Sequence, residues 1–195
     1  MTSHDSFLNE SELLSIGFIE AGSNVKISRF ARFYGANFLV IGENVRIDDF
    51  SIISLGRHSR IGNNVHISCQ TTIHASHGIE IGNFSTISGR VGIYGQSDDY
   101  SGEWLANPTI PSNLRGVNAS LVSIGVHTLI GSNSTVLPGA NIADGVAIGA
   151  HSLVTQPTEP WGIYVGVPAR RIKERNKRVL ELEEQINNPY PSRMK

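Results

Sequence analysis

The chain has 195 residues, of which 39% are hydrophobic and 17% charged, and its formal net charge is −1 at pH 7. A charge so near zero gives no indication of nucleic acid or of an anionic membrane as a partner. No stretch approaches the ~20 apolar residues that span a bilayer, and the first residues lack a basic segment followed by an apolar run. We therefore expect a single cytoplasmic domain without membrane insertion, and the one cysteine, Cys69, excludes a disulfide within the chain.

A short helix is predicted over residues 6–16. Asn9 is a good N-cap, Glu12 stands three residues later as its capping-box partner, and Gly17 follows the end. We assign residues 1–18 to an N-terminal cap that contains this helix.

From Ile124 onward, an aliphatic residue occupies every sixth position: Ile124, Ile130, Val136, Ile142, Ile148 and Val154. A period of six fits neither the 3.6 of a helix nor the 2 of a flat strand. It is typical of a chain that makes one flat side and one corner per repeat, so three repeats make one triangular coil.

The same rule recovers four earlier blocks of three repeats: Ile19, Val25, Ala31; Ile41, Ile47, Ile53; Ile61, Ile67, Ile73; and Ile81, Ile87, Ile93. The phase shifts only between blocks, by four residues after the first, two after the second and third, and 25 after the fourth. All insertions therefore fall on one corner. We predict an all-β, parallel β-helix of about six coils over residues 19–168, with a loop insertion at 94–123. Because solenoids usually bind through such loops, we expect the site there.

After Val154 a segment rich in proline and glycine ends the solenoid. A helix over Ala169–Asn187 is then predicted, with an apolar stripe that packs on the prism or on a neighbouring chain. Residues 169–195 form this C-terminal helix and tail.

The run IGSNSTVLPGANIADGVAIGAHSLVT, followed by YVGVPARRI, resembles the hexapeptide-repeat acyltransferases, particularly galactoside, maltose and lipopolysaccharide-sugar O-acetyltransferases. The resemblance covers about residues 19–175. It implies a left-handed β-helix that forms a homotrimer, with acetyl-CoA bound between subunits as the acyl donor and a sugar as acceptor. By its matching motifs, the resemblance assigns three residues to the pantetheine arm of the cofactor: Ser132, Ala150 and Thr155. It assigns two to the phosphates of the cofactor: Arg170 and Lys173. Arginine and lysine suit that role because phosphates need fixed cations.

Acetyl transfer to a hydroxyl needs a base, for which histidine is suited. The related sugar acetyltransferases carry that histidine in the loop, where this chain has Asp98 or Asp99. Our hypothesis is that His77, on the corner one coil below, is the base and that Asp98 orients or charges it. A corner histidine with only local hydrogen bonds is the alternative. For recognition of the acceptor we propose the side chains of His74, Asp99, Tyr100 and Trp104, and the loop also offers Glu103 and Arg115.

These features predict an acetyl-CoA-dependent O-acetyltransferase acting on a sugar of a cell-surface polysaccharide or glycoside. N-acetylation of an amino sugar nucleotide is the first alternative, and the aspartate in place of histidine favours it because an amine tolerates a weaker base. A zinc hydratase using His66, His74 and His77 is a second alternative, although we predict no metal site, and a non-catalytic scaffold is a third.

Overall fold

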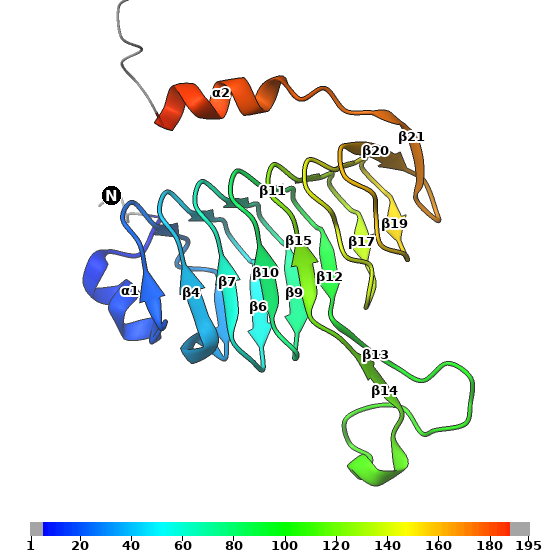
Figure 1. Cartoon of the computed structure of the whole chain (residues 1–195). Coiled ribbons are helices and arrows are strands. Elements are labelled where there is room, and N and C mark those ends of the chain that lie inside the picture. Colours follow the sequence, from blue (N-terminus) through cyan, green and yellow to red (C-terminus); the bar gives the residue numbers. More distant parts are fainter. Residues whose placement is uncertain (1–5, 188–195) are drawn as a thin grey trace, which may run out of the picture.

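The computed structural model describes residues 6–187, and in it the chain winds around the three flat walls of a triangular prism (Figure 1). The first wall is a parallel sheet of β1 (Glu20–Ala21), β4 (Leu39–Ile41), β7 (Ser59–Ile61), β10 (Ile79–Ile81) and β15 (Val122–Ile124). The second wall contains β2 (Lys26–Ile27), β5 (Arg46–Ile47), β8 (His66–Ile67), β11 (Thr86–Ile87), β16 (Leu129–Ile130), β18 (Ala147–Ile148), β20 (Gly162–Val165) and β21 (Arg170–Glu174). The third wall contains β3 (Arg32–Tyr34), β6 (Ile52–Leu55), β9 (Thr72–Ala75), β12 (Gly92–Tyr94), β17 (Thr135–Val136) and β19 (Leu153–Val154).

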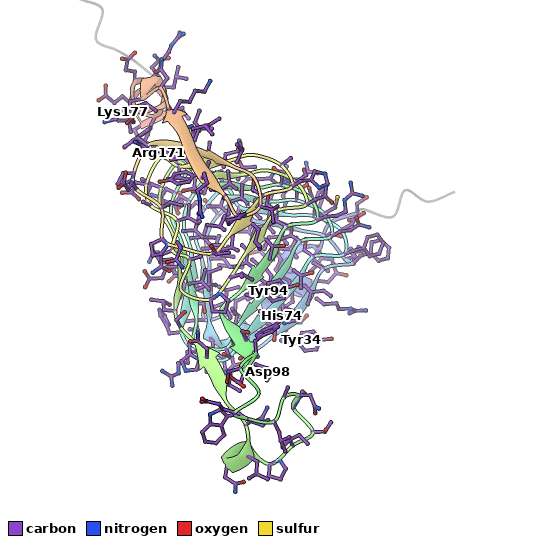
Figure 2. The ribbon with its side chains drawn as sticks, turned by 90° about the vertical axis from the view of Figure 1, so that its right-hand side faces the viewer. Tyr34, His74, Tyr94, Asp98, Arg171 and Lys177 are labelled. Carbon is purple, nitrogen blue, oxygen red and sulfur yellow. The ribbon has the colours of Figure 1, made fainter. Side chains whose placement is uncertain are left out.

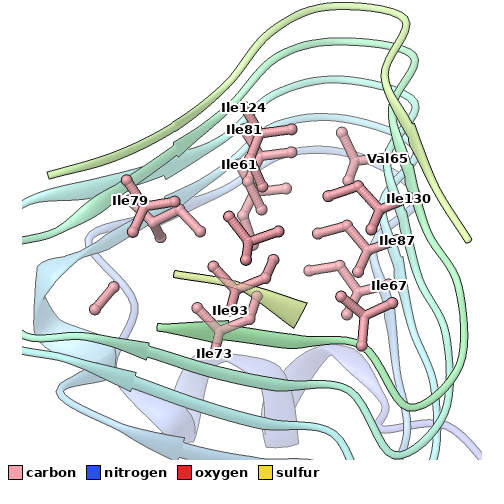
Figure 3. Packing of buried hydrophobic residues seen from close by; sticks show 14 of the residues in the cluster. Ile61, Val65, Ile67, Ile73, Ile79, Ile81, Ile87, Ile93, Ile124 and Ile130 are labelled. Atoms are coloured by element: carbon pink, nitrogen blue, oxygen red, sulfur yellow. The ribbon is translucent and has the colours of Figure 1, made fainter. Parts of the chain in front are cut away.

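Each wall contributes a column of inward aliphatic side chains, which the register stacks one coil above another (Figure 3). Ile81 pairs with Ile61 on one side and with Ile124 on the other, and the three side chains are buried. Burial of each such side chain contributes about 1.5–3 kcal/mol relative to exposure. The predicted left-handed parallel β-helix is confirmed, with about seven coils in place of six.

The predicted phase of the first coil is wrong by two residues. Ala21 pairs with Ile41 and Ile27 pairs with Ile47, whereas Ile19, expected to point inward, is 53% exposed. Val25 and Ala31 accordingly lie two residues before Ile27 and Phe33 and are partly buried against the core. The first insertion is therefore two residues long, like the next two, because Phe33 completes the coil opposite Ile53.

The N-terminal helix is confirmed as α1 (Glu10–Ile16), although it begins after Asn9 and not at residue 6. Asn9 accepts a hydrogen bond from the N–H of Glu12, whose side chain accepts one from the N–H of Asn9 in return. Gly17 follows in the left-handed region, as a helix C-terminus favours.

The prediction of a helix from Ala169 is wrong in its first part. The solenoid continues through β20, where Tyr164 pairs with Ile148 in the core, and β21 then pairs with β20 in antiparallel fashion. Pairing satisfies backbone groups that β20 would otherwise leave open at the edge of the sheet. Helix α2 (Arg178–Asn187) begins only afterwards, and the side chain of Asn176 accepts a hydrogen bond from the N–H of Arg178.

The insertions share one corner, between the third and first walls, as predicted. We call it the loop corner: residues 35–38, 56–58, 76–78 and 95–121. The first holds the 3₁₀ helix η1 (Ala36–Phe38), and the longest holds the antiparallel hairpin β13 (Gln96–Asp98) and β14 (Val117–Ala119) with η2 (Ser112–Leu114) between them. In Figure 1 this hairpin projects below the coils, while α2 runs above them. None of the helices within residues 6–187 is long and apolar enough to cross a membrane.

Candidate active site

A cavity of about 740 Å³ opens where the hairpin leaves the loop corner. We call it the loop cavity, and its lining comes from three neighbouring coils: Ser76, His77, Tyr94, Gln96, Ser97, Asp98, Tyr100, Pro108, Arg115, Val117, Leu137 and Pro138. Its size suits a ligand larger than a single sugar, since small-molecule pockets range over roughly 300–1,000 Å³.

His77 and Asp98 both line the loop cavity, but within residues 6–187 no hydrogen bond joins them. The ring Nδ1 of His77 lies 3.1 Å from the hydroxyl oxygen of Ser76, within hydrogen-bond distance. A carboxylate oxygen of Asp98 accepts a hydrogen bond from the N–H of Asn107 at 3.3 Å, which links the end of β13 to the connection that follows it. The sequence therefore placed both residues in one cavity, and their action as a dyad stays a prediction.

Arg115 brings a positive charge into the same cavity. Its Nε is buried and has no hydrogen-bond partner in the part of the chain that the structure describes. A buried guanidinium nitrogen without an acceptor is costly, so an anionic ligand group would satisfy it. The sequence pointed to Arg115 only as one of several polar residues of the loop, because burial at that position depends on the hairpin.

Of the predicted acceptor-binding residues of the loop, Tyr100 lines the cavity, whereas Asp99 and Trp104 contribute to the packing of the loop itself. The carboxylate of Asp99 accepts hydrogen bonds from the hydroxyl of Ser101 at 2.8 Å and from the N–H of Gly102 at 2.9 Å. The hydroxyl of Ser101 and these backbone groups hold the pKa of Asp99 below its ordinary value. The Trp104 ring packs so closely on Gly116 that a Cβ there would lie 2.6 Å from it. A direct contact of Asp99 or Trp104 with the acceptor stays a prediction.

His74 lies on the outer face of the third wall, beside the loop cavity. Its ring stacks on that of Tyr94, with centroids 5.8 Å apart and 15° between the planes. Figure 2 shows both rings in a row with Tyr34, above Asp98 (Figure 2). Tyr94 was not singled out from the sequence; its position one coil above His74 in register is the signal that identifies it.

The residues assigned to an acyl donor lie elsewhere on the prism. Ser132 and Ala150 occupy successive coils at the corner between the second and third walls, where the N–H of His151 donates to the carbonyl of Ser132 at 2.9 Å. Thr155 and Arg170 line one recess of about 130 Å³. Of the five residues assigned to the donor, Thr155 and Arg170 thus share a recess, and Ser132 and Ala150 share a corner.

Lys173 joins Arg170 on one face of the chain because of a β-bulge. Arg170 pairs with Val165 and Lys173 with Ile163, and the register shifts between Ile163 and Tyr164. Residues three apart on a regular strand point to opposite faces, so without the bulge the two cations would be separated.

Among the residues described, no group of three or more histidine, cysteine, aspartate or glutamate side chains is placed to hold a metal ion. His66, part of the three-histidine alternative, instead pairs with Asp48 on the second wall at 2.8 Å. Burial tends to raise the pKa of Asp48, but the hydrogen bonds from His66 and Arg46 outweigh it and lower the pKa overall.

A triangular β-solenoid of this kind is the fold of the hexapeptide-repeat sugar acyltransferases. The chain is 41% identical over 178 residues to a dTDP-4-amino-4,6-dideoxy-D-glucose acyltransferase of Escherichia coli, which covers 91% of this chain and 93% of the relative. The chain therefore belongs to the hexapeptide-repeat acyltransferase family, although no family model matches it.

Two solved structures illustrate the range of the similarity. AntD, an N-acyltransferase from Bacillus cereus solved with dTDP and 3-hydroxybutyryl-CoA, is 40% identical, with a TM-score of 0.90, over 95% of this chain and 98% of AntD. A galactoside acetyltransferase solved with coenzyme A is 25% identical, with a TM-score of 0.60, over 91% of this chain and 76% of its own. The acceptor named for the Escherichia coli relative and the N-acyl transfer named for AntD correct the emphasis on a sugar hydroxyl and favour the amino-sugar alternative.

Proposed function

We propose that the protein transfers an acetyl or a related short acyl group from coenzyme A to the amino group of a dTDP-linked 4-amino-4,6-dideoxy sugar. The observation that carries the proposal is the similarity, over nine-tenths of both chains, to an enzyme of that acceptor class. The presence of both Asp98 and Arg115 in the lining of the loop cavity supports it, because such an acceptor carries an amine at one end and a diphosphate at the other.

Asp98 acts on the amine. A carboxylate attracts the ammonium form of the acceptor, accepts one of its protons and releases it to solvent, and then accepts a hydrogen bond from the neutral amine. The amine nitrogen attacks the thioester carbonyl carbon, the C–N bond forms, and the C–S bond breaks as coenzyme A leaves. The nitrogen releases one proton, which His77 accepts and passes on to the departing thiolate. This division of labour needs no hydrogen bond between His77 and Asp98.

Arg115 acts on the diphosphate. Its buried Nε has no hydrogen-bond partner among the described residues, so its N–H can donate to a phosphate oxygen. On the donor side, Arg170 and Lys173 hold the phosphates of coenzyme A, while Ser132, Ala150 and Thr155 contact the pantetheine arm. Ser132 and Ala150 lie at a donor corner between the second and third walls, whereas Thr155 follows β19 at the corner that carries the loop cavity. A homotrimer that pairs the donor corner of one subunit with the loop cavity of the next would complete the site.

The deciding experiment offers the purified protein acetyl-CoA with dTDP-4-amino-4,6-dideoxy-D-glucose or with the matched sugar nucleotide that has a hydroxyl at that carbon. We expect an amide product, found by mass spectrometry, and no ester. Ester from the hydroxyl substrate and no amide from the amine would overturn the proposal. Calorimetry with acetyl-CoA provides the second arm, because a scaffold without chemistry would bind neither donor nor acceptor.

A further inference from the structure

The last outward position of four strands on the third wall, β3, β6, β9 and β12, forms a column with one small member. Tyr34 pairs with Ser54, Ser54 with His74, and His74 with Tyr94. We call these four residues the outer column. Three of them carry rings, and only Ser54 does not.

The missing ring leaves a gap of defined width. Parallel strands lie about 4.8 Å apart, so Tyr34 and His74 are separated by two spacings, about 9.6 Å. One flat ring between two others needs about 7–8 Å, and two rings need more than 10 Å, taking 3.5–4.0 Å for each contact. The gap over Ser54 therefore admits one planar ring, whereas His74 and Tyr94, on adjacent strands, already stack on each other.

The gap is open and leads to the loop cavity. A small cavity of about 100 Å³ is lined by Ser54, Gly56 and His74, together with Ser76 and Gln96, which also line the loop cavity. Tyr34, which pairs with Ser54 on the other side in the register, is 61% exposed. The amide of Gln96 supplies a polar group at the edge of the gap.

We infer that this gap binds the nucleobase of the acceptor, a pyrimidine inserted between Tyr34 and His74, while its sugar reaches Asp98 in the loop cavity. The inference rests on the proposed function and adds the residues that select a nucleotide-linked sugar over a free one. Stacking between aromatic rings is tolerant of base identity, so specificity for the base comes from the polar edge. Adenine of coenzyme A has the same planar chemistry, but the cations assigned to that cofactor lie on β21 at the end of the second wall.

The test uses substitutions of Ser54, whose side chain forms the floor of the gap. Ser54→Leu occupies it, whereas Ser54→Ala keeps it open and removes only the hydroxyl. We expect Ser54→Leu to weaken dTDP binding at least 30-fold in calorimetry and Ser54→Ala to weaken it less than threefold. Binding of coenzyme A should stay within twofold of wild type in both. Circular dichroism and the thermal midpoint of each variant verify folding.

A second pair of variants keeps the inference falsifiable if Ser54→Leu does not fold. Tyr34→Ala should weaken dTDP binding about 5- to 100-fold, the range that removal of one stacking ring gives, and Tyr34→Phe should not. Wild-type dTDP affinity in both Ser54→Leu and Tyr34→Ala would overturn the base site while leaving the proposed function intact. Loss of coenzyme A binding with dTDP binding unchanged would assign the gap to the donor and overturn it too. A wild-type protein that binds no dTDP and acylates no dTDP-linked amine would overturn both proposals.

Discussion

Nε2 of His127 lies 2.7 Å from a carboxylate oxygen of Glu183, and this contact joins the body of the solenoid to its C-terminal helix. His127 stands at the corner between the first and second walls and is only 6% exposed. Two further residues hold the same segment: Arg175 donates to the carbonyl of Gly145 at 3.0 Å, and the ammonium of Lys177 lies 5.5 Å from the centroid of the Trp161 ring. The strand β21, which carries the cations Arg170 and Lys173, immediately precedes these contacts.

Glu183→Ala should loosen α2 and, through it, the hold on β21. We expect a loss of about 1–3 kcal/mol in the free energy of unfolding, the typical effect of removing a partly buried hydrogen bond to a charged group. Affinity for coenzyme A should fall about 3- to 10-fold in calorimetry. Glu184→Ala, at the exposed neighbouring position, is the matched control and should change neither quantity measurably. Equal behaviour of the two variants would show that the contact does not position β21.

Gly145 lies directly beneath the ring of Trp161. Its φ is +69°, and a Cβ there would meet the ring at 2.4 Å. Gly139 has a similar φ of +77° but nothing within 4 Å of a Cβ. Gly139→Ala should therefore cost only the backbone strain of about 1–2 kcal/mol, while Gly145→Ala adds overpacking of about 1–3 kcal/mol. Urea unfolding measures the difference. Equal costs for the two alanines would mean that Trp161 moves aside freely.

The walls could be predicted from the sequence because the same aliphatic position recurs in every coil and fixes the register of its neighbours. The first coil shows the limit of this rule. Ile19 and Ile27 both lie in aliphatic series, and only pairing with Ile47 decides that Ile27 points inward. At the other end, the spacing around Ile172 suits a helix, yet the open edge of β20 recruits the segment as a strand.

The sequence could assign the candidate site to the loop corner, but not to individual residues of the loop. The position of the insertions brings His77 and the loop together without any knowledge of the loop's own fold. Which residues then enter the cavity depends on the hairpin, in which Asp98 pairs with Val117, and no periodicity encodes that pairing. For this reason the sequence could not separate the cavity residue Asp98 from Asp99, which organises the loop.

Asp98→Asn should lower kcat/KM for the amino-sugar acceptor about 100- to 10,000-fold, because the amide cannot attract the ammonium or accept its proton. Affinity for coenzyme A should be unchanged. Glu103→Gln removes a charge from the same loop at an exposed position and should leave kcat/KM within twofold. Steady-state kinetics of both variants with acetyl-CoA measures the contrast. A loss of activity in Glu103→Gln equal to that in Asp98→Asn would attribute the effect to the overall charge of the loop.

His77→Gln separates the base from the carboxylate. If His77 accepts the proton released during attack, the variant should lose most of its activity near neutral pH and recover part of it at higher pH, where hydroxide takes up that proton in its place. A pH profile of kcat for His77→Gln with the shape of the wild-type profile would remove His77 from proton transfer and leave it a corner residue held by Ser76.

Asp99 makes the order of the loop depend on pH in a direction that its contacts fix. Hydrogen bonds from Ser101, Gly102 and Trp104 lower the pKa of Asp99 in the folded protein. A group with a depressed folded pKa contributes its full stabilisation above the unfolded value, about 3.9, and loses it as the pH falls through the folded value. The chemical shift of the Gly102 amide in a two-dimensional NMR titration should therefore have its midpoint below 3.9. Ser101→Ala, which removes the largest contribution, should move that midpoint upward, and an unchanged midpoint would show that the hydroxyl does not hold the carboxylate.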